Sequence, residues 1–115
     1  MKDEFLDYIN DILDAMTKAE SFIVDYDFEI FSRDWKTIFA VIRALEIIGE
    51  ATKKIPENIR ANYSNIPWKS IAGIRDKLIH GYDNIDLNLV WETVDQQIPY
   101  LKHQFQKILK DFASK

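Results

Sequence analysis

The 115-residue sequence contains no cysteine, and this absence removes several classes of chemistry at once. Disulfides, thiolate nucleophiles and cysteine-based zinc sites are excluded, and the composition is compatible with a reducing compartment. The N-terminal segment is acidic and leads into an amphipathic rather than a uniformly apolar stretch. We therefore expect neither a signal peptide nor a membrane span, and we interpret the protein as cytoplasmic.

Glycine and proline are also scarce, at three residues each. A many-stranded sandwich or barrel would need more of these residues for its turns, so the scarcity favours an all-α fold with long helices. The length is close to that of one domain, and we expect a single domain over residues 1–115. With 47% hydrophobic and 30% charged residues, the chain can bury a core and is not expected to be disordered.

Apolar residues recur every three or four positions, which predicts amphipathic helices packed in a bundle. A helical turn followed by a loop is expected over 56–63, Asp86 is expected to cap the last helix, and Pro99 is expected to bend it. The four long helices are predicted at Asp3 to about Val24, Asp34 to Lys54, Ile66 to His80 with a stop at Gly81, and Leu87 to about Phe112.

The same spacing predicts which side chains face the core. We expect Trp35, Trp68 and Trp91 to be core anchors rather than surfaces on which bases stack. Gly49 is expected where a neighbouring helix comes close, and His103 on the solvated surface. The other residues expected to face inward are Phe5, Leu6, Ile9, Ile12, Leu13, Met16, Ala19, Phe22, Ile23, Ile38, Phe39, Ile42, Leu45, Ile48, Val90, Val94, Leu101, Phe105 and Ile108.

Charge is distributed unevenly along the chain. The formal net charge is −4 overall, but residues 1–31 carry two basic and nine acidic residues, whereas residues 32–115 carry thirteen basic and ten acidic ones. The whole chain does not have the basic character of a typical nucleic-acid binder. We expect any polyanion to meet the second part of the chain.

An arginine, a histidine and a tyrosine lie close together near the expected end of the third helix: Arg75, His80 and Tyr82. A histidine in a last helical turn is stabilised as a cation by the free carbonyls and the helix dipole, and an arginine one turn earlier can pair with Asp76 or Glu50. Taken alone, the residues favour this structural account over a catalytic one.

Three stretches of the sequence, in the order that a known family has them, change that preference. They are VIRALEIIGEA at 41–51, IPWKSIAGIRDKLIHGY at 66–82, and the segment 86–94 that contains VWETV. Together with the Arg-x4-His-x-Tyr pattern of Arg75, His80 and Tyr82, they resemble HepT-type proteins of the HEPN superfamily. The resemblance covers most of the chain.

The resemblance implies a HEPN-type antiparallel four-helix bundle with short extra helical turns that forms a homodimer. It implies a metal-independent endo- or exoribonuclease toxin acting on cellular RNA, by family analogy tRNA. The implied partner is a minimal nucleotidyltransferase antitoxin, which uses ATP to adenylylate Tyr82. This chain itself is expected to need no cofactor or metal and to bind neither DNA nor a membrane.

The residue types suit that chemistry. RNA cleavage without a metal needs a proton to leave the 2′-hydroxyl, charge stabilisation on the phosphorane, and a proton for the departing 5′-oxygen. His80 is the candidate acid or base and Arg75 the candidate stabiliser of charge. Five residues place these two side chains about 140° apart on an ideal helix. Either the helix unwinds near Gly81, or a two-fold axis brings two copies of the motif together, and we favour the dimer.

Several residues have open alternatives. Tyr82 is either the acceptor of AMP or a hydrogen-bonding loop tyrosine. Glu46 or Glu50 could hold Arg75, or Arg43 and Glu46 could form an ordinary pair within their helix. The basic residues that could follow an RNA backbone, or simply be solvated surface side chains, are Lys53, Lys54, Arg60, Lys69 and Lys77.

Two other functional classes remain open at this point. The first is a catalytically silent HEPN binding module that partners a nucleotidyltransferase and binds nucleotide or RNA. The second is a purely structural helical dimer.

Overall fold

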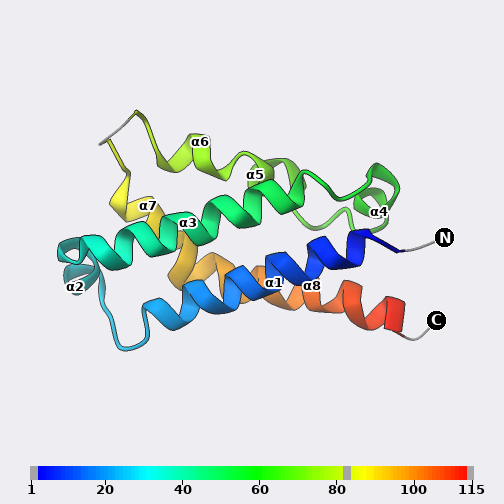
Figure 1. Ribbon diagram of the computed structural model, residues 1–115, viewed down its shortest axis with the longest axis horizontal. Helices are drawn as coiled ribbons and strands as arrows, with labels where there is room; N and C mark the ends of the chain where they lie inside the picture. Colours follow the sequence, from blue (N-terminus) through cyan, green and yellow to red (C-terminus); the bar gives the residue numbers. More distant parts are fainter. Residues whose placement is uncertain (1–2, 82–83, 114–115) are drawn as a thin grey trace.

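The computed structural model describes residues 3–81 and 84–113. This part of the chain is helical (Figure 1), and its one pairing of extended residues is an isolated bridge between Ile79 and Ile85. The all-α prediction is therefore confirmed. The elements are α1 (Phe5–Phe22), α2 (Phe28–Arg33), α3 (Trp35–Thr52), α4 (Glu57–Asn62), α5 (Trp68–Ala72), α6 (Ile74–Leu78), α7 (Leu87–Glu92), the π-helical turn η1 (Thr93–Gln97) and α8 (Ile98–Ala113).

Helix α1 runs antiparallel to α3 and to α8, which share one direction (Figure 1). α1 packs along α3 and α8, and the short helices α5 and α6 lie along α3 (Figure 1). The two ends of the described chain lie at the same end of the molecule, with α2 at the other end. The expected four-helix bundle is present, but its third helix is divided into α5 and α6, and its fourth consists of α7, η1 and α8.

The core follows the predicted spacing along most of each long helix. Fully buried side chains include Ile9, Ile12 and Met16 of α1 and Ile38 and Leu45 of α3. Trp68 is buried with its ring edge-on to Phe105, and Trp91 is half-buried against Phe31, so these two tryptophans are core anchors as predicted.

Three predicted core residues are instead exposed: Phe22 at 37%, Trp35 at 47% and Phe39 at 60%. The inward stripe of α3 passes through Ile38, Val41 and Leu45, so Trp35 and Phe39 lie to one side of it and contact each other with ring centroids 5.7 Å apart. Phe31, fully buried, is supplied to this end of the core by α2.

Helix α2 lies between the first two predicted long helices, where no helix was predicted. Asp27 caps it by accepting a hydrogen bond from the Ile30 N–H at 2.8 Å, and Arg33 pairs with Glu29 one turn away at 2.7 Å. The next residue, Asp34, caps α3 and accepts a hydrogen bond from the Tyr26 hydroxyl at 2.5 Å. That hydrogen bond is the main reason the pKa of Asp34 lies below its usual value.

The last long helix contains a wide turn where Pro99 was expected to bend it. Proline has no N–H to donate to the carbonyl of Asp95, and its ring would clash with that carbonyl in a regular α-helix. The π-helical turn η1 ends two residues before Pro99 and accommodates it. Asp86 caps α7 as predicted, accepting from the Leu89 N–H at 3.1 Å. Over the described residues, no helix combines the length and the apolar character that crossing a membrane requires.

Candidate functional site

The segment that carries the predicted motif is less regular than expected. The third helix was predicted to run unbroken from Ile66 to His80, but it starts at Trp68, is interrupted at Gly73 and ends at Leu78. Glycine is a poor helix former, and the Gly73 N–H closes α5 by bonding to the Lys69 carbonyl at 3.1 Å. Gly73 was the local signal for this break.

His80 lies in a tight loop and not in the last helical turn. Ile79 is extended and bridges to Ile85, the His80 N–H donates to the Asn84 carbonyl at 2.7 Å, and the Asp86 N–H donates to the Leu78 carbonyl at 2.9 Å. Gly81 adopts a left-handed φ of +95°, which favours glycine. The prediction that Gly81 ends the helix is therefore wrong, because the helix ends at Leu78 and Gly81, three residues later, turns the loop that follows. The His80 side chain is exposed.

Arg75 is held by a carboxylate from another helix. Its Nε donates to Glu46 Oε2 at 3.1 Å, while Glu46 Oε1 accepts from Arg43 Nη1 at 3.4 Å. Glu46 thus bridges two guanidinium groups. It holds Arg75 and also pairs with Arg43 within its own helix, so the two predicted alternatives for this residue occur together. The Glu46 side chain is 22% exposed, against 63% for Arg75 and 62% for Arg43. Both arginine side chains are therefore largely accessible to an anion.

Gly49 explains how α6 comes close enough to α3 for this contact. A Cβ atom added at Gly49 would lie 3.3 Å from the Ile71 carbonyl oxygen and 3.3 Å from Ile74 Cγ2. These separations are tighter than ordinary packing, so a side chain here would push the α5–α6 segment away. The prediction that a neighbouring helix approaches closely at Gly49 is confirmed.

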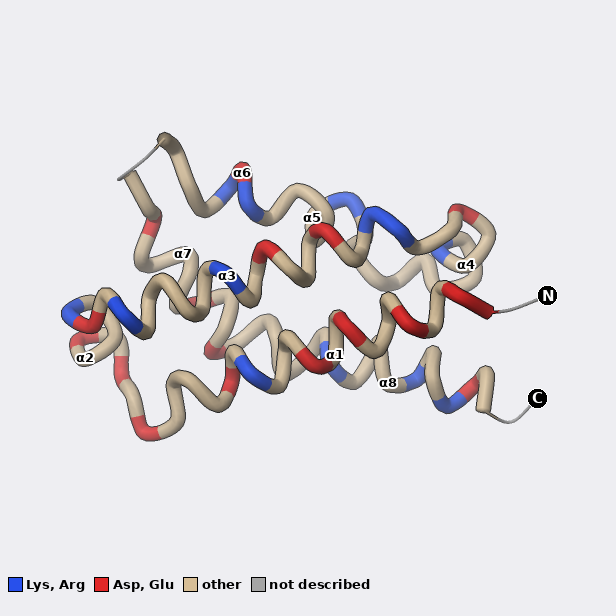
Figure 2. The backbone as a smooth tube through the Cα atoms, viewed as in Figure 1, with Lys and Arg blue, Asp and Glu red and all other residues tan. Residues whose placement is uncertain are grey.

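Most of the remaining candidate residues come from the end of α3 and from α4, α5 and α6. Figure 2 shows basic residues along α5, α6 and the end of α3, whereas α1 carries mostly acidic ones. Glu50, Lys53, Lys54 and Lys69 are exposed, and their side chains make no hydrogen bond or ion pair with other described residues. Glu50 does not hold Arg75, which leaves that contact to Glu46.

Two of the basic candidates have local partners. Arg60 is half-buried and donates to the carbonyls of Ile55 and Thr52, each at 3.0 Å, so it closes the C-terminal end of α3. Lys77 donates to the Ser70 hydroxyl. A step of two residues along an α-helix turns the side-chain direction by about 200° about the helix axis. Lys77 and Arg75 therefore project from opposite sides of α6.

Tyr82 lies outside the described residues. His103 is exposed on α8, as predicted. Over residues 3–81 and 84–113, no group of three or more histidine, aspartate or glutamate side chains is arranged to hold a metal ion.

Comparison with known proteins decides the family. A family model described as "Ribonuclease HepT-like" matches residues 12–108. The chain belongs to the HepT-like ribonuclease family. The resemblance read from the motif and its flanking stretches is thereby confirmed.

Relatives of this HepT-like chain align over nearly its whole length. A protein of Thermococcus cleftensis named "Probable ribonuclease HepT" is 48% identical over 96% of this chain and 100% of its own length. A "Putative RNase" of Methanocaldococcus jannaschii is 48% identical over 94% of this chain and 93% of its own. A "Putative RNase" of Caldanaerobacter subterraneus subsp. tengcongensis is 41% identical over 90% of this chain and 92% of its own length. No solved structure matches.

Proposed function

We propose that this HepT-like ribonuclease is the toxin of a toxin–antitoxin pair, an endo- or exoribonuclease that cleaves cellular RNA, in particular tRNA, without a metal ion. Arg75 and His80 carry the reaction. The observation that carries this proposal is the pair of exposed motif side chains, with Arg75 fixed by Glu46 and His80 presented on the adjoining loop. The RNA substrate and the toxin role rest on the family resemblance.

Arg75 binds the scissile phosphate in this account. Its guanidinium is permanently charged, and its donors match phosphate oxygens, so it can stabilise the charge that develops on the phosphorane. The Glu46 carboxylate accepts a hydrogen bond from Arg75 Nε and so restricts the arginine side chain before RNA binds. The second guanidinium on Glu46, that of Arg43, keeps the local charge positive.

His80 moves the protons. A neutral imidazole has a nitrogen that can accept the proton of the 2′-hydroxyl, and a protonated one can donate to the 5′-oxygen. One chain supplies one motif histidine, whereas the reaction needs both an acid and a base. We propose that two copies of the chain share the site, so that the two His80 side chains divide these roles.

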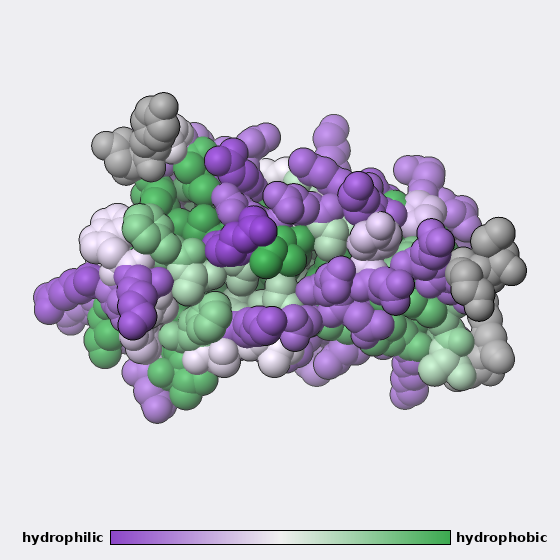
Figure 3. All heavy atoms as spheres, viewed as in Figure 1, coloured by the Kyte–Doolittle hydropathy of each residue, from purple (hydrophilic) through white to green (hydrophobic). Residues whose placement is uncertain are grey.

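The outward face of α3 supports a dimer. Trp35 and Phe39 are exposed there, and Arg43 follows Phe39 by one turn. A groove of about 370 Å³ between α1 and α3 adjoins this face, and Figure 3 shows apolar and charged residues together there. Its lining includes the apolar Phe22 and Ile47 and the charged Asp11, Asp14, Lys18 and Arg43. Because Arg43 lies at this groove and also contacts Glu46, a second copy docked on it would meet the neighbourhood of Arg75.

A single substitution tests that interface. Phe39→Glu places a charge in the exposed apolar face and should convert the dimer to monomer in analytical ultracentrifugation, with loss of cleavage. Tyr100→Glu, at a 67% exposed position on α8, is the matched control and should leave the dimer intact. A wild-type protein that is monomeric and fully active would contradict the shared site.

Regulation is proposed at Tyr82. A cognate nucleotidyltransferase joins the tyrosine oxygen to the α-phosphorus of ATP, and pyrophosphate leaves. The attached phosphate and adenosine then compete with RNA for Arg75 and His80. Tyr82→Phe should abolish neutralisation by the transferase, whereas Tyr100→Phe should preserve it. Full neutralisation of the Tyr82→Phe protein would contradict this step.

The central experiment is RNA cleavage in excess EDTA, with end-labelled tRNA and total RNA as substrates. Mass spectrometry first establishes that Tyr82 is unmodified. His80→Ala and Arg75→Ala should each lower cleavage by about a hundredfold or more. The controls are His103→Ala and Arg33→Ala, which remove another exposed histidine and another exposed arginine paired with a glutamate.

The outcomes separate the functional classes. Discrete cleavage that is lost only in the motif variants supports the ribonuclease. RNA binding without cleavage by the unmodified wild-type protein would instead support a catalytically silent binding module. Cleavage that disappears in EDTA and returns with a divalent ion would contradict the metal-independent mechanism.

A further inference from the structure

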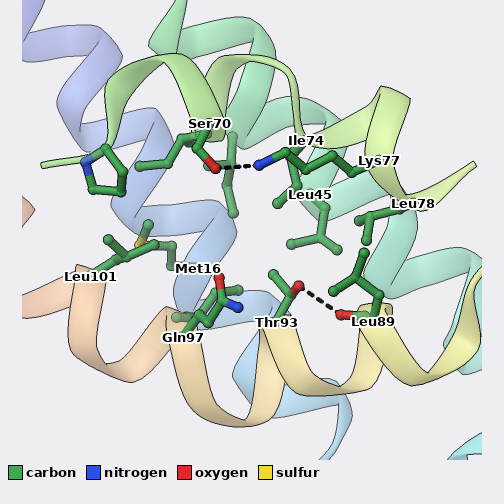
Figure 4. Close-up of a pocket in the computed structure, with 14 residues that line it drawn as sticks. Met16, Leu45, Ser70, Ile74, Lys77, Leu78, Leu89, Thr93, Gln97 and Leu101 are labelled. Carbon is green, nitrogen blue, oxygen red and sulfur yellow. Dashed lines mark hydrogen bonds between the residues drawn. The ribbon is translucent and has the colours of Figure 1, made fainter.

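A cavity of about 160 Å³ lies between the α5–α6 segment and the last helix, separate from the groove on α3 (Figure 4). Its floor is formed by Met16 of α1 and Leu45 of α3. Ile74 and Leu78 line it from α6, and Leu101 lines it from α8. These side chains are apolar, so the inner part of the cavity offers a ligand dispersion contacts and exclusion from water.

Polar groups line two sides of the cavity, with Lys77 and Ser70 on the α5–α6 side and Thr93 and Gln97 of η1 on the other (Figure 4). Lys77 and Ser70 are exposed, and the Lys77 ammonium donates a hydrogen bond to the Ser70 hydroxyl. The Lys77 ammonium forms no ion pair with any carboxylate of the described residues. Deeper in, the Thr93 hydroxyl donates to the Leu89 carbonyl at 2.7 Å. Among the described residues that line the cavity, Lys77 is the only charged one. One cation beside a mostly apolar chamber matches a ligand with a single negative charge at one end.

We propose that this cavity binds a small apolar monocarboxylate. Its volume is close to that of the roughly 150 Å³ apolar cavity that accepts benzene in another protein, so a ring or a chain of about six carbons fits the inner part. The carboxylate then accepts hydrogen bonds from Lys77 Nζ and Ser70 Oγ. A monoanion suits the site because one ammonium group neutralises one charge.

The proposed site is distinct from the RNA-cleaving residues. Arg75 faces Glu46 on one side of α6, whereas Lys77 lies on the opposite side with Ile74 and Leu78 beside the cavity. A ligand here fills the space between α6 and α8 and holds these helices together. Because α6 carries Arg75 and leads into the His80 loop, occupancy should stabilise the motif segment.

The test is a titration of the purified full chain with benzoate and hexanoate, followed by ¹H–¹⁵N NMR. Benzamide, a neutral molecule of nearly the same shape, is the ligand control. We expect benzoate to bind with a dissociation constant of about 0.1 to 10 mM and benzamide at least about fivefold more weakly. Shifted amide signals should come from α5, α6, η1 and the start of α8.

Two variants examine the site itself. Lys77→Met keeps an unbranched side chain one atom shorter and removes its charge, so it should weaken benzoate binding at least about fivefold and leave benzamide binding unchanged. Lys69→Met makes the same change on α5 outside the cavity and should have no effect on either ligand. Leu89→Trp fills the cavity and should abolish binding of both.

The proposal is contradicted if benzoate shifts signals elsewhere on the protein, or if it binds Lys77→Met as tightly as the wild type. Equal affinity for benzoate and benzamide would also overturn it, because the cavity would then select for apolar volume and not for the carboxylate. These measurements do not involve RNA, so their outcome does not depend on the proposed ribonuclease activity.

Discussion

The long helices and the motif segment of this protein are built differently. α1 and α3 have 18 residues each and α8 has 16, and their buried faces form most of the core. α5 and α6 have five residues each and are followed by a loop turned at Gly81. Helices this short are unstable by themselves, so they depend on packing against α3.

Stability and the proposed reactivity belong to different parts of the molecule. Side chains that hold the bundle together are buried and apolar, whereas Arg75 and His80 are exposed on the irregular segment. The two regions meet at α3, which contributes core residues on one face and Glu46 and Gly49 toward α6. Substitutions in each region should therefore affect different properties.

The largest loss of stability is expected from the core. Phe105 is fully buried, and the centroid of its ring lies 5.5 Å from that of the Trp68 ring. Phe105→Ala removes this packing and leaves a cavity, so the free energy of unfolding measured with urea should fall by about 3–5 kcal/mol. A loss of less than about 1 kcal/mol would mean that this end of the bundle is not part of the cooperative core.

The contact between the two regions is tested at Gly49. Gly49→Ala improves helix propensity but crowds Ile71 and Ile74, and we expect a net loss of about 1–2 kcal/mol together with reduced cleavage. Gly73→Ala is the matched control, because a Cβ there meets only the Lys69 carbonyl oxygen at 3.5 Å. A Gly49→Ala protein as stable and active as Gly73→Ala would contradict the account of close approach.

A smaller effect is expected at the junction of the α4 loop and α8. Tyr63 donates to Asp111 Oδ2 at 2.8 Å, and burial together with this carboxylate raises the pKa of Tyr63 to about 12. The unfolded tyrosine loses its proton near pH 10, so the folded state binds more protons between pH 10 and 12 and stability falls as the pH rises.

Tyr63→Phe removes both the hydrogen bond and this titration. Near neutral pH it should cost about 1 kcal/mol, and the difference in stability between wild type and variant should shrink as the pH is raised from 10 to 12. Urea unfolding at several pH values provides the measurement. A difference that stays constant over that range would show that Tyr63 does not titrate as described.

The smallest change in stability is expected at the motif itself. Glu46→Gln weakens the hold on Arg75 and should alter the free energy of unfolding by less than about 0.5 kcal/mol, because both arginine partners are largely exposed. It should nevertheless lower kcat for RNA cleavage about tenfold. Glu29→Gln breaks the comparable exposed pair with Arg33 and should leave cleavage unchanged.

Sequence periodicity was sufficient for the long helices because their buried faces repeat over many turns. It failed for Trp35 and Phe39, since the side of α3 that is covered depends on where α2 places Phe31, and α2 is too short to give a periodic signal. The end of the third helix was wrong because the pairing of Ile79 with Ile85 replaces helical hydrogen bonds there.

The motif residues were singled out by the resemblance to HepT-type proteins, because their types and spacing alone favoured a structural account. Their partners in the fold were not fixed by sequence. The choice between Glu46 and Glu50 depends on how α6 sits along α3, which the close approach at Gly49 determines. The contact between Lys77 and Ser70 joins α6 to α5 across the break at Gly73. A prediction that treated this region as one straight helix could not place that contact.

The most direct test measures cleavage and stability on the same three proteins: wild type, His80→Ala and His103→Ala. Our account predicts that all three unfold within about 0.5 kcal/mol of one another and that only His80→Ala loses metal-independent RNA cleavage. Equal cleavage by His80→Ala and wild type would contradict it.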